Sequence, residues 1–181
     1  MVQPGTSDQQ ISAMCKAGKN GCNLVGHPSK GGVPFLEMRG TEADLETVLN
    51  VAPGVATFVE PDQEVHMIPE IAASQVEAAT WGLNRVGADQ RSRGGAGASV
   101  FVLDTGVRVS HQDFTGRASP ALDMTVGDPV ECNGDMSCAG DVQGHGTHCA
   151  GTAAGETFGV APQATVRSVK VLSDQGSGSW S

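Results

Sequence analysis

The chain has 181 residues, 39% apolar and 17% charged, which is enough for one medium-sized domain or two small ones. With 20 acidic against 11 basic side chains, its formal net charge of −9 argues against nucleic acid or an anionic membrane as a partner. No stretch approaches the roughly 18 apolar residues of a membrane span, and Met1–Thr6 has neither the basic nor the apolar part of a secretory leader.

The first third of the chain predicts a small α+β unit. Residues 1–32 show no clear period of 2 or 3.6 and receive no assignment. Val33–Met38 predicts a strand, Glu42–Leu49 predicts a helix preceded by the capping-box pattern Thr41-x-x-Asp44, and Val55–Val59 predicts a second strand. The expected unit is therefore strand, helix, strand.

A domain boundary and then an apolar strand are expected next. Residues 63–98 contain no long periodic segment, and the glycines of Gly94–Gly97 indicate a turn or a flexible joint. Ser99–Leu103 predicts a central strand of a parallel sheet, apolar on both faces, that ends at Asp104. Sites in open α/β sheets lie at the carboxyl ends of strands, so Asp104 is a candidate functional residue. A solvated turn aspartate is the alternative.

A segment rich in glycine and alanine, Gly144–Gly155, carries His145 near its start. Glycine costs a helix about 1 kcal/mol relative to alanine, so this composition indicates a helix that must pack very closely. Thr165–Leu172 predicts a further strand, which a right-handed crossover places parallel to Ser99–Leu103. We therefore expect Asp104 and His145 to meet, with the carboxylate holding the imidazole as a base for a hydroxyl nucleophile.

The spacing of the cysteines indicates whether the protein is found in an oxidising or a reducing compartment. Cys15 and Cys22 form one closely spaced pair, Cys132 and Cys138 form another, and Cys149 stands alone. These spacings favour two local disulfides, and hence an extracellular location, over zinc, which requires tighter Cys-x-x-Cys spacing or further ligands. Unpaired thiols in a reducing compartment are the alternative.

Two motifs, in this order along the chain, resemble those of the subtilisin-like serine proteases (peptidase S8). Val102-Leu-Asp104-Thr-Gly106 is similar to the aspartate motif of that family, and Gly144-His145-Gly-Thr-His148-Cys-Ala-Gly151-Thr is similar to its histidine motif. The resemblance implies that Asp104 orients His145, that His145 is the general base and then the general acid, and that His148 packs beneath the site. It also implies an α/β fold in which helices flank a parallel sheet.

Further segments are similar to the proteinase K branch of that family. They are Trp81-Gly-Leu83, Phe114-Thr-Gly-Arg-Ala118, the cysteine after His148, and Val169–Gly178. This resemblance implies that Cys149 is a thiol next to the catalytic imidazole and outside any disulfide.

The same resemblance extends to substrate binding. It implies that Gly176, Ser177 and Gly178 pair with the extended backbone of a polypeptide substrate. Trp180 would border a subsite for apolar or aromatic side chains, or else belong to the core. A monomer is expected.

An inhibitory segment is expected before the peptidase domain. Val33–His66 resembles the second half of the family's propeptide, most clearly at Phe58–Val65, and its end would lie through the active cleft like a product. Comparison with Trp81-Gly-Leu83 places the maturation cut near Ala73 and Ser74. The expected segments are 1–32 without assignment, 33–73 as the propeptide-like part, and 74–181 as the start of the peptidase domain.

The chain departs from compact members of the family between its two motifs. The longer spacing there indicates an insertion at Glu131–Gly140, a surface loop that a Cys132–Cys138 disulfide would pin near the site entrance. Asp113 stands where some members place a calcium ligand. Because Glu156–Val160 lacks the loop that completes such a site, no cofactor is expected, and calcium is the alternative.

The third member of a catalytic triad is not found in the sequence. Up to Ser181 there is no Gly-Thr-Ser-Met-Ala-like nucleophile motif and no asparagine segment for an oxyanion hole. Gly5-Thr6-Ser7 precedes both other members and is interpreted as a chance match. We therefore expect the 181-residue chain alone to be inactive, although the resemblance implies a serine endopeptidase.

Three other functions are alternatives to this interpretation. Asp104-Thr105-Gly106 also occurs in aspartic-protease lobes, which are almost wholly β and require a second aspartate. His145, His148 and Cys149 could belong to a metal hydrolase, although His-x-x-His departs from the i, i+4 spacing of helical zinc sites. A truncated product could instead bind peptides or protease partners through residues 33–66 and the substrate strand without cleaving them.

Overall fold

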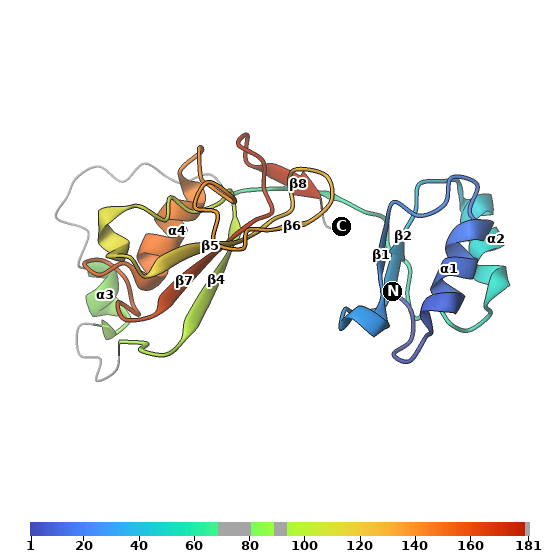
Figure 1. The fold of residues 1–181 in the computed structure, drawn as a ribbon, viewed down its shortest axis with the longest axis horizontal. Coiled ribbons are helices and arrows are strands. Elements are labelled where there is room, and N and C mark those ends of the chain that lie inside the picture. The colour runs from blue at the N-terminus through green and yellow to red at the C-terminus, as the bar shows by residue number, and fades with distance from the viewer. Residues whose placement is uncertain (69–80, 89–93, 180–181) are drawn as a thin grey trace. The chain divides into compact units, whose positions relative to one another are not determined.

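A computed structural model describes residues 1–68, 81–88 and 94–179 of the chain (Figure 1). The chain forms two compact units, residues 1–63 and residues 64–180. The functional boundaries expected from the sequence, near residues 32 and 73, remain predictions. The expected cut near Ala73 and Ser74, and Trp180, lie outside the described residues.

The first unit packs two helices beside a two-stranded antiparallel sheet. Helices α1 (Asp8–Ala17) and α2 (Glu42–Val51) accompany strands β1 (Leu24–Gly26) and β2 (Phe35–Glu37), with a 3-10 turn at Pro28–Lys30. The core of this unit is formed by Val2, Ile11, Met14 and Val48.

Helix α2 forms as predicted. The hydroxyl of Thr41 accepts a hydrogen bond from the backbone N–H of Asp44, and the carboxylate of Asp44 accepts one from the backbone N–H of Thr41. The strand expected over Val33–Met38 is present but shorter, as β2. The strand expected over Val55–Val59 is wrong. Its backbone pairs with Met1–Gln3 only around one isolated antiparallel bridge, Val2 to Ala56, and this pairing is too short to count as a strand.

The part of the chain without assignment, residues 1–32, contains helix α1. Its start is a capping box between Ser7 and Gln10, and Ile11 and Met14 are its buried residues. A disulfide joins Cys15 near the end of the helix to Cys22, as the cysteine spacing predicts. Two buried positions do not establish a helical period, which is why the sequence pattern did not reveal this helix.

The second unit is α/β, as expected, with a mostly parallel sheet. Its strands are β4 (Ser99–Asp104), β5 (Ala118–Asp123), β6 (Val130–Glu131) and β7 (Thr165–Lys170), in the order β4-β7-β5-β6. Strand β7 runs parallel to both β4 and β5, and β6 is antiparallel to β5. The parallel pairing of β4 with β7 was expected from the crossover rule.

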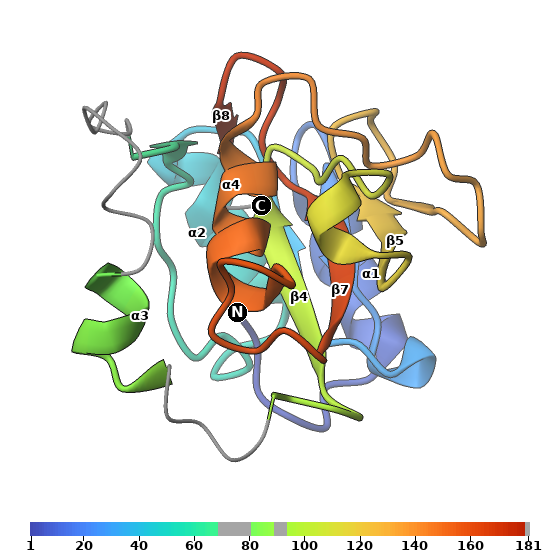
Figure 2. The ribbon, with the colours of Figure 1, turned by 90° about the vertical axis from the view of Figure 1, so that its left-hand side faces the viewer.

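Helix α4 (His145–Ala154) covers one face of β4 and β7 (Figure 2). Ala150 and Ala154 are fully buried in the core cluster that contains Val102 and Val166, so small side chains bring the helix close to the sheet. On the other face Phe101 and Leu103 are 59% and 62% exposed. Because β4 lies at the edge of the described sheet, the expectation of a central strand buried on both faces is wrong for this chain.

The remaining elements of the second unit are short. They are β3 (Glu64–His66), α3 (Trp81–Arg85), a 3-10 turn at Gln112–Phe114, and β8 (Ser177–Ser179), which pairs antiparallel with β3. Among the described residues no helix has the length and apolar character needed to cross a membrane.

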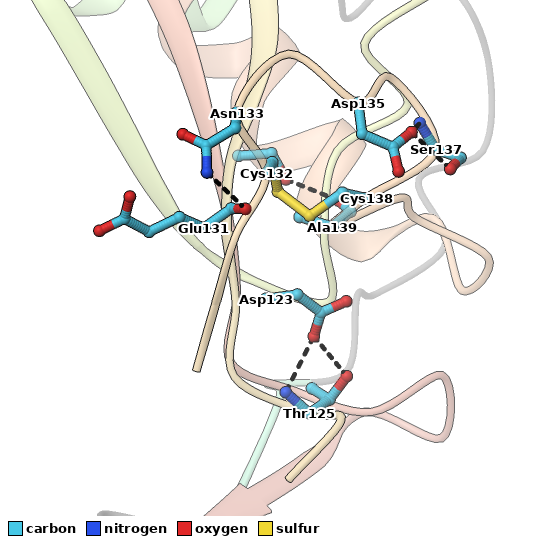
Figure 3. Close-up of a disulfide and its surroundings, with 10 residues drawn as sticks. Asp123, Thr125, Glu131, Cys132, Asn133, Asp135, Ser137, Cys138 and Ala139 are labelled. Atoms are coloured by element: carbon cyan, nitrogen blue, oxygen red, sulfur yellow. Dashed lines mark hydrogen bonds between the residues drawn. A yellow bond between two sulfur atoms is a disulfide. The ribbon is translucent and has the colours of Figure 1, made fainter. Parts of the chain in front are cut away.

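The expected disulfide between Cys132 and Cys138 is present (Figure 3). Asp135 accepts hydrogen bonds from the backbone and hydroxyl of Ser137 inside this loop. The sequence predicts a surface loop, but Cys132 and Ala139 are buried, so only part of the loop lies on the surface. The carbonyl of Ala139 accepts hydrogen bonds from the Val107 N–H and the Ser168 hydroxyl, which anchors the end of the loop against the turn after β4.

Candidate active site

Asp104 is placed by the sheet. It is the last residue of β4, opposite Lys170 in the parallel register with β7, and it is buried. Its Oδ1 accepts a 2.7 Å hydrogen bond from the backbone N–H of Thr105. The carboxylate is therefore held at the carboxyl end of the strand, where the sequence predicts a functional group.

His145 is placed by the start of helix α4. Its Nδ1 lies 2.8 Å from Oδ1 and 2.9 Å from Oδ2 of Asp104. The side chains of His145 and Asp104 are only 14% and 12% exposed. The contact requires a proton on Nδ1, because a carboxylate can only accept, and this leaves Nε2 as the ring nitrogen available to a reactant.

Two glycines allow the helix and the strand turn to approach this closely. A Cβ atom on Gly146 would lie 2.1 Å from the carbonyl oxygen of Gly106 and 3.0 Å from Cβ of Asp104. Gly106 itself has φ of +104°, and a Cβ there would lie 2.5 Å from the carbonyl oxygen of Gly140. The glycines of both motifs are therefore requirements of the contact between Asp104 and His145.

The expected substrate strand holds a segment of the same chain. Strands β3 and β8 pair antiparallel, with Val65 opposite Gly178 and His66 opposite Ser177, and Met67 N–H donates to the carbonyl of Gly176 at 2.8 Å. This pairing places Gly176, Ser177 and Gly178 against an extended backbone.

That segment reaches the imidazole. The carbonyl oxygen of Ile68 lies 3.1 Å from Nε2 of His145. The ring of His145 therefore lies between two acceptors, the Asp104 carboxylate at Nδ1 and the Ile68 carbonyl at Nε2. A pocket lined by Met67, Gln143, Gly144 and His145 adjoins this contact.

The other residues of the histidine motif differ in their positions. The Sγ of Cys149 lies 3.7 Å from His145 Nδ1, and Cys149 is in neither disulfide, as expected. His148 is exposed, so the expectation that it packs beneath the site is wrong for the described part of the chain. Within those residues, Asp104, His145 and Cys149 are the one group with metal-ligand atoms within 4.8 Å of one another, and this group does not include His148.

Asp113, the residue considered for calcium, accepts hydrogen bonds from the backbone. Its Oδ1 accepts a 2.9 Å hydrogen bond from the N–H of Thr157, and its carbonyl accepts one from Glu156. These contacts close the turn that follows α4.

Asp141 and the hydroxyl of Thr105 also belong to the site, although their sequence motifs did not predict it. Thr105 Oγ1 donates to Asp141 at 2.9 Å and accepts from the N–H of Gly146 at 3.0 Å. Burial opposes ionisation of Asp141, but hydrogen bonds from Thr147, Gly144 and Thr105 outweigh it and hold the pKa of Asp141 below its ordinary value. The only available signal was an acidic residue shortly before a helix start.

Comparison with known proteins identifies the second unit. Residues 95–181, which include Asp104 and His145, match the model of the subtilase family, peptidase S8. This part of the chain belongs to the subtilase family. The expected resemblance to subtilisin-like serine proteases is therefore confirmed.

Two curated subtilases illustrate the extent of the similarity. The subtilisin-like serine protease Cla h 9.0101 of Davidiella tassiana is 45% identical over 137 residues, which are 68% of this chain and 24% of that protein. The extracellular serine proteinase of Thermus sp. (strain Rt41A) is 41% identical over 139 residues, 70% of this chain and 30% of that protein. The chain thus spans less than a third of the length of either relative.

A solved structure is also similar. A cold-adapted subtilisin-like serine proteinase is 38% identical, with a TM-score of 0.42, over 48% of this chain and 29% of its own.

Proposed function

We propose that this chain is the amino-terminal part of a subtilisin-like serine endopeptidase precursor, with Asp104 and His145 as two members of its catalytic triad. The observation that carries the proposal is the contact of His145 Nδ1 with both carboxylate oxygens of Asp104, at 2.8 and 2.9 Å. This contact lies at the carboxyl end of the parallel strand β4, inside the segment that matches the subtilase family.

The chemistry assigns a different task to each residue. Asp104 holds the imidazole in one orientation and with its proton on Nδ1, and it stabilises the positive charge that forms on the ring. His145 Nε2 takes the proton of a serine hydroxyl and later gives it to the leaving amine. The sequence contains no subtilase-like serine motif, so we expect the 181-residue chain alone not to hydrolyse peptides.

The substrates we propose are polypeptides bound as an added strand. Strand β8 already pairs with an extended segment in antiparallel fashion, and Gly176, Ser177 and Gly178 provide its backbone. Trp180 would border an apolar subsite. The net charge of −9 makes nucleic acid an unsuitable partner.

The segment Glu64–Ile68 is proposed as the inhibitory end of the protein's own propeptide. It occupies the strand position that a substrate would take, and its Ile68 carbonyl meets the proposed catalytic base. Cleavage near Ala73 and Ser74 would release it. Two disulfides and a relative named as extracellular support secretion.

Labelling by a fluorophosphonate serine probe tests the proposal. The longest natural form of the protein, the 181-residue chain, and His145→Ala and His148→Ala variants of the long form are compared after removal of the propeptide. We expect the long form and His148→Ala to be labelled, because His148 is exposed on the same helix, and we expect the chain and His145→Ala not to be. Equal labelling of the wild-type long form and its His145→Ala variant would refute the assignment.

A second candidate is peptide binding without cleavage. The observation that favours it is the β3–β8 pairing, which needs no serine. Absence of labelling in every form, together with binding of a peptide of sequence 64–68 by a chain lacking that segment, would support this candidate.

A further inference from the structure

We infer that Thr105 is a positioning residue, whose side-chain hydroxyl, together with Asp141, sets the spacing between Asp104 and His145. The inference deepens the proposed function and rests on it, because a positioning role has meaning only if the Asp104–His145 pair is used. Thr105 touches no substrate-facing atom of the imidazole. It would act through the backbone elements that carry the two side chains.

Every polar group of Thr105 is engaged, and the residue is fully buried. Its N–H donates to Asp104, its hydroxyl donates to Asp141, and the same hydroxyl accepts from the N–H of Gly146. Its carbonyl oxygen accepts from the ammonium group of Lys170, which is also buried. One side chain therefore joins the carboxyl end of β4 to the first turn of α4.

Asp141 extends this connection over the start of the helix. In addition to the Thr105 hydroxyl, it accepts hydrogen bonds from the Gly144 N–H at 2.8 Å, from the Thr147 N–H at 2.9 Å and from the Thr147 hydroxyl. The first N–H groups of a helix have no partner within the helix, and a carboxylate there is favoured by the helix dipole. Asp141 thus fixes both residues that flank His145–Gly146 to the hydroxyl of Thr105.

The consequence for the Asp104–His145 pair is geometric. Asp104 is held by the N–H of Thr105, while the helix that begins at His145 is held by the hydroxyl of the same residue. Removing the hydroxyl leaves the buried Gly146 N–H and an oxygen of Asp141 without that partner, and such groups are costly. We expect the helix start to shift to recover partners, which lengthens the Nδ1 to carboxylate contact.

The experiment observes that contact directly in the 181-residue chain. Histidine labelled with ¹⁵N gives a downfield proton signal for a hydrogen-bonded Nδ1–H, and the His145→Ala variant assigns it. Three variants are compared: Thr105→Val removes the hydroxyl but keeps the shape, Thr105→Ser keeps the hydroxyl, and Thr152→Val is the matched control. The hydroxyl of Thr152 lies on the same helix and bonds the His148 carbonyl.

We expect the His145 signal to be lost or shifted upfield in Thr105→Val and kept in Thr105→Ser and Thr152→Val. A folded Thr105→Val chain with an unchanged signal would overturn the inference. If Thr105→Val does not fold, Asp141→Asn is used instead, because an amide cannot accept all the hydrogen bonds that the carboxylate accepts. An unchanged signal in that folded variant would overturn the inference equally.

Activity of the long form separates this inference from the proposed function. A displacement of about 1 Å in a catalytic group can cost about 100-fold in rate, so we expect Thr105→Val to lower kcat by that order with KM unchanged and Thr105→Ser to restore it. A wild-type long form without activity would refute the proposed function, while the signal of the chain would still test the geometry. An active Thr105→Val enzyme with unchanged kcat would overturn the inference alone.

Discussion

Two glycines of helix α4 differ in their surroundings although the sequence places them alike. A Cβ on Gly146 would lie 2.1 Å from the carbonyl oxygen of Gly106, whereas a Cβ on Gly151 would meet no described atom within 4 Å beyond the backbone of its own helix. We expect Gly146→Ala to destabilise the unit by about 1–3 kcal/mol through overpacking. Gly151→Ala should stabilise it by up to about 1 kcal/mol because alanine favours helix. Urea unfolding measures both, and equal effects would contradict the close approach at Gly146.

At the same scale, the sequence predicted Asp104 and His145 but not the residues that hold them. The pair could be predicted because each residue lies in a recognisable motif and because the crossover rule brings the two motifs to one sheet edge. Thr105 and Asp141 are 36 positions apart, and their hydrogen bond follows no periodic pattern. It depends on where the disulfide loop returns to the site, which only the folded structure determines.

At the scale of elements, the loop closed by Cys132 and Cys138 leads directly into Asp141. Its end is fixed by two hydrogen bonds to the Ala139 carbonyl. Replacing both cysteines by serine should destabilise the second unit by about 2 kcal/mol, the value for a short closed loop, and should weaken the His145 Nδ1–H signal. The control is the same replacement at the other disulfide, in the first unit. If both double variants affect the His145 signal equally, the loop has no special relation to the site.

Helices and strands were predicted correctly where neighbouring residues in the sequence carry a clear pattern for them. Helix α2 was predicted at its correct start because Thr41 and Asp44 form the capping box that the sequence suggests. Helix α1 also begins with a capping box, at Ser7 and Gln10. It was not predicted because only two of its residues are buried, which is too few to give a helical period in the sequence. The strand expected at Val55–Val59 failed because apolar β-branched residues form a strand only where a partner backbone is present. That partner is a property of the tertiary fold.

For the whole second unit, the β3–β8 pairing keeps the proposed cleft occupied. Met67→Pro removes the N–H that donates to Gly176, while Met67→Ala keeps it. We expect the proline variant to release Glu64–Ile68, so that the amides of Ser177–Ser179 exchange with solvent faster than in the alanine variant. Hydrogen exchange followed by NMR measures this. Equal protection in both variants would mean that the Met67 hydrogen bond does not hold the segment.

Acid should weaken both units, because aspartates in each have a lowered pKa. For Asp44, in the first unit, the main cause is the hydrogen bond from the backbone of Thr41. For Asp135, in the second, the main cause is the hydrogen bond from the side chain of Ser137. Each carboxylate is thus a better hydrogen-bond acceptor in the folded chain than its protonated form would be.

The sign of the pH dependence follows from these directions. A carboxyl whose folded pKa lies below its ordinary value of 3.8 contributes stability in full above that value, and the contribution is lost as the pH falls through the folded pKa. Asp44→Asn should therefore lower the stability of the first unit at neutral pH. The variant should lose this effect in acid, where the protonated wild-type carboxyl is as uncharged as the asparagine. Asp135→Asn should do the same for the second unit only. Urea unfolding followed by the NMR signals of each unit, at neutral and at strongly acidic pH, measures both. A deficit in Asp44→Asn that persists undiminished in acid would mean that the charge of this carboxylate does not stabilise the capping box.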